Sequence, residues 1–117
     1  MRLSEMHFGP TPPVEGYGPG FFRVGGRVFS GPVLLIPGGP VAWEGIPNLE
    51  PIVEHRAGFD VCLMGMGAEI AFLPQALREV LEDVGIGVET MATPAACRTY
   101  NVLLAEERRI AAALMPI

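Results

Sequence analysis

The chain has 117 residues, half of them hydrophobic and 18% charged, which is typical of one globular domain and excludes a disordered segment. All eight basic residues are arginines and the net charge is −5, which argues against a nucleic-acid binder and against a polybasic membrane-surface protein. Residues 1–10 lack an apolar signal region, and no apolar run reaches the ~18 residues of a membrane span. We therefore expect a cytoplasmic protein.

The first part of the chain is rich in Pro and Gly, which predicts turns joined by short strands. Residues 1–20 show weak periodicity, so we expect them to wrap the surface or begin an edge strand, with residues 1–15 poorly ordered. The pair Gly25-Gly26 stands between "FFRV" and "RVFS" and predicts a two-residue hairpin turn. The apolar run "VLLI" that follows at residues 33–36 is typical of a buried strand.

Helical and strand patterns alternate in the second part of the chain. Asn48 is placed to cap a short helix that ends near Ala57. Residues 59–65, "FDVCLMG", and residues 86–91, "IGVETM", read as two central strands. Strands that alternate with helices indicate an α/β layered domain with parallel neighbours, to which the early hairpin adds an antiparallel piece.

Two longer helices are expected. The first starts with Pro74 at its first helical position, ends before Gly85, and carries an apolar stripe. The stripe consists of Leu77, Val80, Leu81 and Val84. The second has Thr93 as its N-cap and Pro94 as its first helical residue, and it runs to about Leu114 with one apolar face directed to the core. That face consists of Ala96, Tyr100, Leu103, Ile110 and Leu114. Within this helix, Glu106 and Arg109 have the spacing of an ion pair.

Two features are expected to meet beyond the carboxyl ends of the central strands, where open α/β sheets bind ligands. One is the glycine loop "GMG" at residues 65–67, and the other is the N-terminus of the helix that starts at Thr93. Unpaired N–H groups at the helix start and the guanidinium of Arg98 would together form an anion pocket. Two alternatives stay open. The glycines alone predict a tight turn, and Arg98 alone predicts an internal salt bridge to Glu69, Glu44 or Glu89.

No catalytic set is evident in the sequence. Cys97 lies in the first turn of the predicted helix, where the helix dipole and Arg98 would lower its thiol pKa. A small buried side chain is the alternative reading of this cysteine. His7 and His55 have no metal-ligand spacing, so we expect no metal and no cofactor.

Four parts of the chain carry a family resemblance: "GYGPGFFRVGGRVFSGPVLLIP", Trp43, "GMG" and "TPAACRTYNVLLAEERRIAAALMP". Together they resemble the Mth-type family of domains of unknown function, which includes the mitochondrial complex I (NADH dehydrogenase) assembly factor 3. Because the chain lacks a mitochondrial transit segment, we expect it to be a bacterial member. The most specific part is T-x-x-A-x-R-T-Y-N-x-L-x-x-E, which begins at Thr93. The resemblance implies one three-layer α/β domain over residues 1–117, with a mixed central sheet and the N-terminal antiparallel hairpin. It also implies a shared ligand-binding cleft, formed here by Gly65, Met66, Gly67, Thr93, Arg98, Tyr100 and Asn101.

Three functions are compared on this basis. The first is a non-enzymatic assembly or interaction protein whose partner is a respiratory complex subunit or another assembly factor. Such a protein would reach the inner membrane through its partner, which would dock on the sheet edge or on the face that carries Arg98. The second is a small-molecule anion-binding module. The third is an enzyme with Cys97 as its nucleophile. The sequence leaves the oligomeric state open, a homo-oligomer included.

Overall fold

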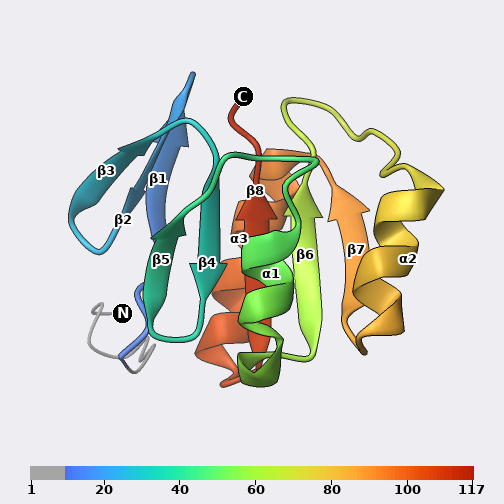
Figure 1. Ribbon diagram of the computed structural model, residues 1–117. Helices are drawn as coiled ribbons and strands as arrows, with labels where there is room; N and C mark the ends of the chain where they lie inside the picture. Colours follow the sequence, from blue (N-terminus) through green and yellow to red (C-terminus); the bar gives the residue numbers. More distant parts are fainter. Residues whose placement is uncertain (1–9) are drawn as a thin grey trace.

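The computed structural model describes residues 10–117, which fold into two β-sheets and three α-helices (Figure 1). In chain order the elements are β1 (Val14–Gly18), β2 (Phe21–Val24), β3 (Arg27–Ser30), β4 (Val33–Ile36), β5 (Gly39–Ala42), α1 (Glu50–Glu54), the 3₁₀ turn η2 (Arg56–Gly58), β6 (Val61–Gly65), α2 (Gln75–Asp83), β7 (Gly87–Met91), α3 (Thr93–Ala105) and β8 (Ile110–Leu114). Residues 1–9, part of the segment 1–15 for which we expect poor order, lie outside the described residues.

The first three strands form a small antiparallel sheet in the order β1-β2-β3. Val24 lies opposite Arg27 across the β2–β3 turn, so the loop between them has two residues. Gly25 and Gly26 have φ angles of 60° and 76°. Positive φ at both central positions is the type I′ geometry, whose twist matches that of paired strands and which favours glycine. The predicted hairpin is therefore confirmed, with β1 as a third strand beside it.

The second sheet has five strands in the order β5-β4-β8-β6-β7. β6 runs parallel to both β7 and β8, whereas β4 runs antiparallel to β5 and β8. The sheet is thus mixed, as the resemblance implied. β8 lies at its centre and all five of its residues are buried. The three alanines of β8 leave room for helices to pack closely on both faces of the sheet.

The prediction of one helix from Thr93 to about Leu114 is wrong beyond Ala105, because the chain reverses and its last part forms β8. The reversal is a Schellman motif. The N–H of Arg108 donates to the Leu103 carbonyl at 3.0 Å. Likewise, the N–H of Glu107 donates to the Leu104 carbonyl at 3.0 Å. Glu107 holds the left-handed position of the motif, with φ of 60°. Glycine normally occupies this position, so the sequence lacks the usual stop signal.

The predicted Glu106–Arg109 ion pair is also wrong, since these residues lie in the reversal and not on a continuous helix. Arg109 instead places its Nε 3.3 Å from Oδ2 of Asp60. Its guanidinium also donates to the carbonyl of Ala57 at 3.0 Å. The pair joins the start of β8 to the segment before β6. Both side chains are exposed, so its contribution to stability is small.

The five-stranded sheet is covered on both faces, which gives three layers (Figure 1). Alternate residues of each strand point to opposite faces, so β8 sends Ala112 to one hydrophobic cluster and Ala113 to the other. The first cluster lies under α3 and the small sheet and includes Phe22 and Tyr100. The second lies under α1 and α2 and includes Ile52 and Leu81. The predicted α/β architecture is confirmed.

The two helices of the second cluster are shorter than predicted. α1 covers only Glu50–Glu54, and its N-cap residue is Leu49 without a side-chain cap. Asn48 does not cap it, since its amide donates to Glu44 at 3.2 Å. Pro74 is the N-cap residue of α2 and not its first helical residue.

The apolar stripe of α2 is only partly covered. Leu81 is fully buried and Leu77 packs partly against the second cluster. Val80 and Val84 remain 46% and 39% exposed. The reason is the position of α2 beside β7, the edge strand of the sheet (Figure 1). A helix at an edge packs against fewer neighbours than a helix centred over a sheet face.

Candidate functional site

The glycine loop and the start of α3 do meet beyond the carboxyl ends of β6 and β7. The N–H of Met66 donates to the Met91 carbonyl at 2.8 Å, which extends the pairing of the two strands. The N–H of Thr93 donates to the Gly67 carbonyl at 2.7 Å. This juxtaposition follows from the parallel pairing of β6 and β7, which brings both carboxyl ends to one edge of the sheet.

Thr93 is the central residue of this meeting point and is fully buried. It is the first residue of α3 and not the N-cap as predicted, because the N-cap residue is Ala92. Its Oγ1 accepts a hydrogen bond from the N–H of Gly67 at 2.9 Å. The same hydroxyl donates to the carbonyl of Met115 at 2.7 Å. One side chain therefore joins the glycine loop, the first turn of α3 and the segment that follows β8. Its hydrogen-bonding groups face these segments and not an open cleft.

Glycine is required at positions 65 and 67 for different structural reasons. A Cβ atom on Gly65 would lie 2.8 Å from Oγ1 of Thr93 and 3.0 Å from Cδ2 of Leu114, so only glycine fits there. Gly67 has a φ of +112°, a conformation that side chains rarely adopt, which agrees with the tight-turn reading. Met66 between them is partly buried and packs against the second cluster. Close packing and turn geometry thus account for this loop without a ligand.

Arg98 is exposed, and its guanidinium forms no ion pair with any carboxylate of residues 10–117. The internal salt bridge to Glu69, Glu44 or Glu89 is therefore absent from this part of the chain. Few helix-start N–H groups remain beside it, because that of Thr93 already donates to Gly67 and Pro94 has none. The positively charged guanidinium of Arg98 is therefore exposed to solvent.

Tyr100 and Asn101 lie one turn further along α3 and serve the fold. Tyr100 is buried in the first cluster, and burial raises the pKa of its phenol to about 12. The amide of Asn101 pairs with the backbone of Val14 in β1 in both directions. It donates to the Val14 carbonyl at 2.9 Å and accepts from the Val14 N–H at 2.8 Å. Asn101 therefore joins the small sheet to α3 across 87 residues of sequence.

Cys97 is a buried thiol in the first cluster. Burial raises its pKa to about 11, and the neighbouring charge of Arg98 offsets this only in part. The expectation of a lowered pKa is thus wrong, because burial outweighs the nearby positive charge. Because a thiolate and not a thiol is the reactive form, the geometry supports the reading of Cys97 as a packed side chain.

The structure shows one apolar pocket that we did not predict. It has a volume of about 140 Å³ and is lined by Ile70, Ala71, Phe72 and Thr90. These residues belong to the loop between β6 and α2 and to the end of β7 (Figure 1). The signal in the sequence is "EIAF", where two large apolar residues occur in a segment with neither helical nor strand periodicity.

The ligand-binding role of the seven residues from Gly65 to Asn101 stays a prediction. Within residues 10–117 there is also no group of three or more His, Cys, Asp or Glu side chains arranged to hold a metal ion. None of the helices in the described part of the chain is long and apolar enough to cross a bilayer.

The geometry so far defines a class: a two-sheet α/β domain whose glycine loop, third helix and C-terminal segment are fastened together by Thr93. The chain belongs to the family described as "Protein of unknown function (DUF498/DUF598)", which matches residues 14–115. A solved structure of a Bordetella pertussis protein described as a Mth938-like domain is 28% identical, with a TM-score of 0.72 over 90% of this chain and 85% of that one. The Mth-type resemblance is therefore confirmed.

Other relatives are similar over most of the chain. An uncharacterized protein of Rhodobacter capsulatus is 43% identical over 117 residues, which covers all of this chain and 94% of that protein. A crystal structure described as an outer membrane protein from Bartonella henselae is 36% identical, with a TM-score of 0.82 over 94% of this chain and 98% of that one. NADH dehydrogenase [ubiquinone] 1 alpha subcomplex assembly factor 3 of Danio rerio is 33% identical over 110 residues. That match covers 88% of this chain and 63% of the zebrafish protein.

Proposed function

We propose that this protein is a non-enzymatic assembly protein that supports the building of a respiratory NADH dehydrogenase through a protein partner. The observation that carries the proposal is the similarity to assembly factor 3, which extends over 88% of the chain and is 33% identical in the zebrafish protein. The chain spans about 63% of that relative. The proposal therefore concerns the function of the shared domain.

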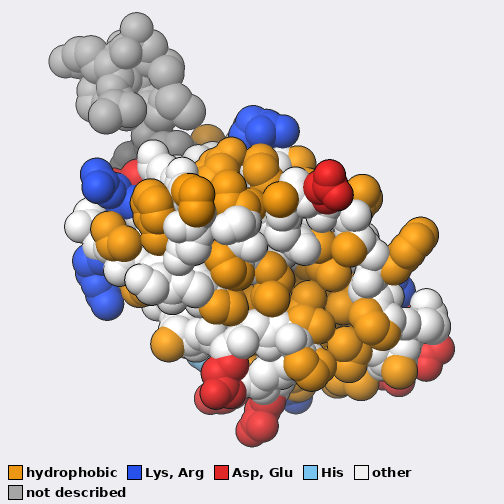
Figure 2. All heavy atoms as spheres, turned by 90° about the horizontal axis from the view of Figure 1, so that it is seen from above, with side chains coloured by type: hydrophobic (Ala, Val, Ile, Leu, Met, Phe, Trp, Pro, Cys, Tyr) orange, Lys and Arg blue, Asp and Glu red, His pale blue; other side chains and the backbone are white. Residues whose placement is uncertain are grey.

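The geometry of the site supports a binding role over a catalytic one. The polar groups of Thr93 and Asn101 form hydrogen bonds within the fold, and Tyr100 is buried in the core. Burial also keeps the Cys97 thiol protonated. Hydrophobic side chains cover much of the face at the carboxyl ends of β6, β7 and β8 (Figure 2). A broad exposed apolar surface on a globular domain is typical of a protein–protein contact.

The test is deletion of the gene in its own host, followed by a native gel of the membranes stained for NADH oxidation. We expect the band of the assembled complex to fall strongly and to return when the wild-type gene is restored. A complex of normal amount in the deletion strain would overturn the proposal.

Two arginine variants then ask whether the face of Arg98 is the working surface. Arg98→Ala should fail to restore the complex, because the exposed guanidinium has no ion pair within residues 10–117 and is available to a partner. Arg108→Ala is the matched control, since Arg108 is also exposed and has no side-chain hydrogen bond to the described residues. If both variants restore the complex equally, Arg98 is not part of the docking surface.

An anion-binding module is the second candidate, and the exposed, unpaired charge of Arg98 favours it. Calorimetry with inorganic phosphate, acetate and nucleotides measures it directly. Binding heat that disappears in Arg98→Ala would support the module. Absence of binding heat with all three ligand classes would refute the anion-binding module and leave the assembly role.

A further inference from the structure

The outer edge of β7 has backbone groups that the sheet does not use. In a parallel pair, alternate residues of a strand direct their N–H and C=O groups to the same neighbour. Gly87 and Met91 face β6, as shown by the bonds from the Gly87 N–H to the Asp60 carbonyl and from the Met66 N–H to the Met91 carbonyl. Val88 and Thr90 therefore face outward from the edge of the sheet.

One end of this edge is already occupied by α2. The guanidinium of Arg78 donates to the carbonyl of Val88 at 3.1 Å and also lies 3.6 Å from the carboxylate of Glu82. Such a cationic side chain blocks strand pairing at that position. The outward groups of Thr90, one step further, have no partner among residues 10–117. The free part of the edge is thus short and begins at Thr90.

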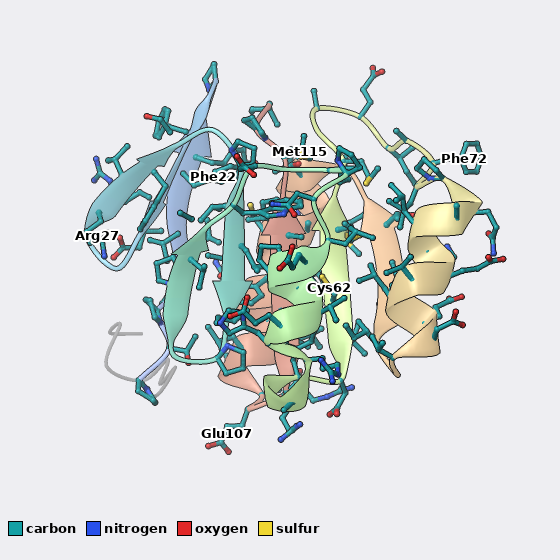
Figure 3. All side chains as sticks on the ribbon, viewed as in Figure 1. Phe22, Arg27, Cys62, Phe72, Glu107 and Met115 are labelled. Carbon is teal, nitrogen blue, oxygen red and sulfur yellow. The ribbon has the colours of Figure 1, made fainter. Side chains whose placement is uncertain are left out.

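The apolar pocket lies directly beside this free part. Thr90 forms one of its walls, and Ile70, Ala71 and Phe72 form the others. Its volume of about 140 Å³ accommodates one aliphatic side chain. Phe72 is 98% exposed and Ile70 is 71% exposed. Figure 3 shows the ring of Phe72 projecting from the loop above α2. A large apolar side chain with so little cover is a common anchor of binding surfaces.

The segment of the chain that forms the pocket is acidic. Residues 65–91 contain five carboxylates and one arginine, so this segment carries four of the five net negative charges of the chain. Arg78 is the only basic residue of the segment and is engaged by Val88 and Glu82. The exposed carboxylates of Glu69 and Glu89 lie in the loop before the pocket and on β7 itself. A segment that binds here must bring positive charge to match them.

We propose that the free end of β7 is a docking site for an extended segment of a partner protein. The segment adds to the edge at Thr90, places one apolar side chain in the pocket beside Phe72, and carries Lys or Arg on either side of that side chain. Strand addition of this kind combines main-chain hydrogen bonds, which give affinity, with a side-chain pocket, which gives specificity. The proposal deepens the assembly function and rests on it only for the existence of a protein partner.

The charges also disfavour a second copy of this chain as the occupant. Pairing β7 with β7 of another copy would bring two acidic segments together, and like charges across an edge oppose association. Sedimentation velocity checks this point. We expect a monomer for the wild type and for Phe72→Ala. A dimer that disappears in Phe72→Ala would show that a second copy occupies the site and would overturn the proposal.

The direct test is selection of linear peptides from a random phage-displayed library on the whole protein. We expect the selected peptides to alternate apolar residues with Lys or Arg. Their affinity should fall about tenfold or more on Phe72→Ala, which removes an anchor side chain. Val102→Ala is the matched control, because Val102 is also an exposed hydrophobic residue, at 57%, but lies on α3. The amide of Thr90 should gain protection from hydrogen exchange in the complex.

The outcomes separate the two proposals. Failure to select any peptide, or selection of peptides that bind Phe72→Ala and wild type equally, would overturn the docking site. Selection of acidic peptides would overturn its charge argument. Peptides that bind as expected, together with a normal respiratory complex in the deletion strain, would keep the docking site and refute the assembly function.

Discussion

Replacing Thr93 by valine tests the central claim about the site, namely that its hydroxyl holds three segments together. Valine keeps the branched shape and fills the same buried space. It removes the acceptor for the Gly67 N–H and the donor to the Met115 carbonyl. The change therefore separates hydrogen bonding from packing at one position.

The expected loss follows from the two hydrogen bonds of 2.9 Å and 2.7 Å. A part-buried peptide group left without its partner costs about 1–2 kcal/mol, the lower part of the range for buried groups. Because Thr93→Val leaves two such groups unpaired, it should lower the free energy of unfolding by about 2–4 kcal/mol. At about 4 °C per kcal/mol for a domain of this size, the melting temperature should fall by about 8–16 °C. Thr93→Ser keeps the hydroxyl and deletes one methyl group, for a loss of about 1 kcal/mol.

Urea unfolding followed by circular dichroism measures both variants against the wild type. The diagnostic result is the order, with valine costing more than serine although valine is the more hydrophobic residue. Hydrogen exchange at the Gly67 amide should also be faster in Thr93→Val. If valine is as stable as the wild type, or serine is the worse substitution, packing and not the hydroxyl fastens the loop and the reasoning is refuted.

Three further changes test other parts of the argument. Glu107→Gly should raise the free energy of unfolding by about 1 kcal/mol, because glycine adopts the left-handed conformation without strain. The side chain of Glu107 projects away from the fold, so little contact is lost (Figure 3). A lower stability in urea unfolding would contradict this. Asn101→Leu should lower stability by about 1–3 kcal/mol and speed hydrogen exchange at the Val14 amide, whereas an unchanged exchange rate would show that β1 is held by other contacts. Burial raises the pKa of Cys62 to about 12 and of Cys97 to about 11, from 9.0 for an exposed thiol, so the unfolded chain ionises first as pH rises. The contribution of the two thiols to stability should then be constant below about pH 9 and fall above it by up to about 1.4 kcal/mol per pH unit and thiol, and a Cys97→Ala variant with the same alkaline slope in urea unfolding would contradict this.

Local signals predicted the five strands β2, β3, β4, β6 and β7. The Gly25-Gly26 turn and the apolar run at residues 33–36 each require only nearby residues, and both features are present as β2–β3 and β4. The same holds for β6 and β7, whose apolar runs are bounded by turns. In each case the short-range pattern and the long-range packing favour the same structure.

The last part of the chain could not be predicted in this way. "IAAAL" has the composition of a helix, since alanine and leucine are strong helix formers. It nevertheless forms β8, because the centre of a narrow sheet between two helical layers requires small side chains on both faces. That demand comes from tertiary contacts and overrides propensity. The boundary between α3 and β8 is also hard to predict, because Glu107 occupies the left-handed position where glycine is usual.

The candidate site shows the same limit for function. Thr93, Ala96, Tyr100 and Asn101 belong to the segment that carries the family resemblance, and all four act inside the fold, through hydrogen bonds or close packing. Arg98 is the exception, because its charge faces outward. A motif can thus be highly specific because it fastens a fold, without marking the surface that binds a partner.

The working surface is therefore better sought among residues that the fold does not need. A side chain that is almost fully exposed, such as Phe72, contributes little to the stability of the isolated domain. Phe72 lies beside a pocket and an unpaired strand end, so we expect it to form contacts only when a partner is bound. If Phe72→Ala unfolds like the wild type in urea but fails to restore the respiratory complex, stability and function lie on separate residues of this domain. If Phe72→Ala restores the complex fully while Arg98→Ala does not, the partner docks on α3 and the edge of β7 has no part in assembly.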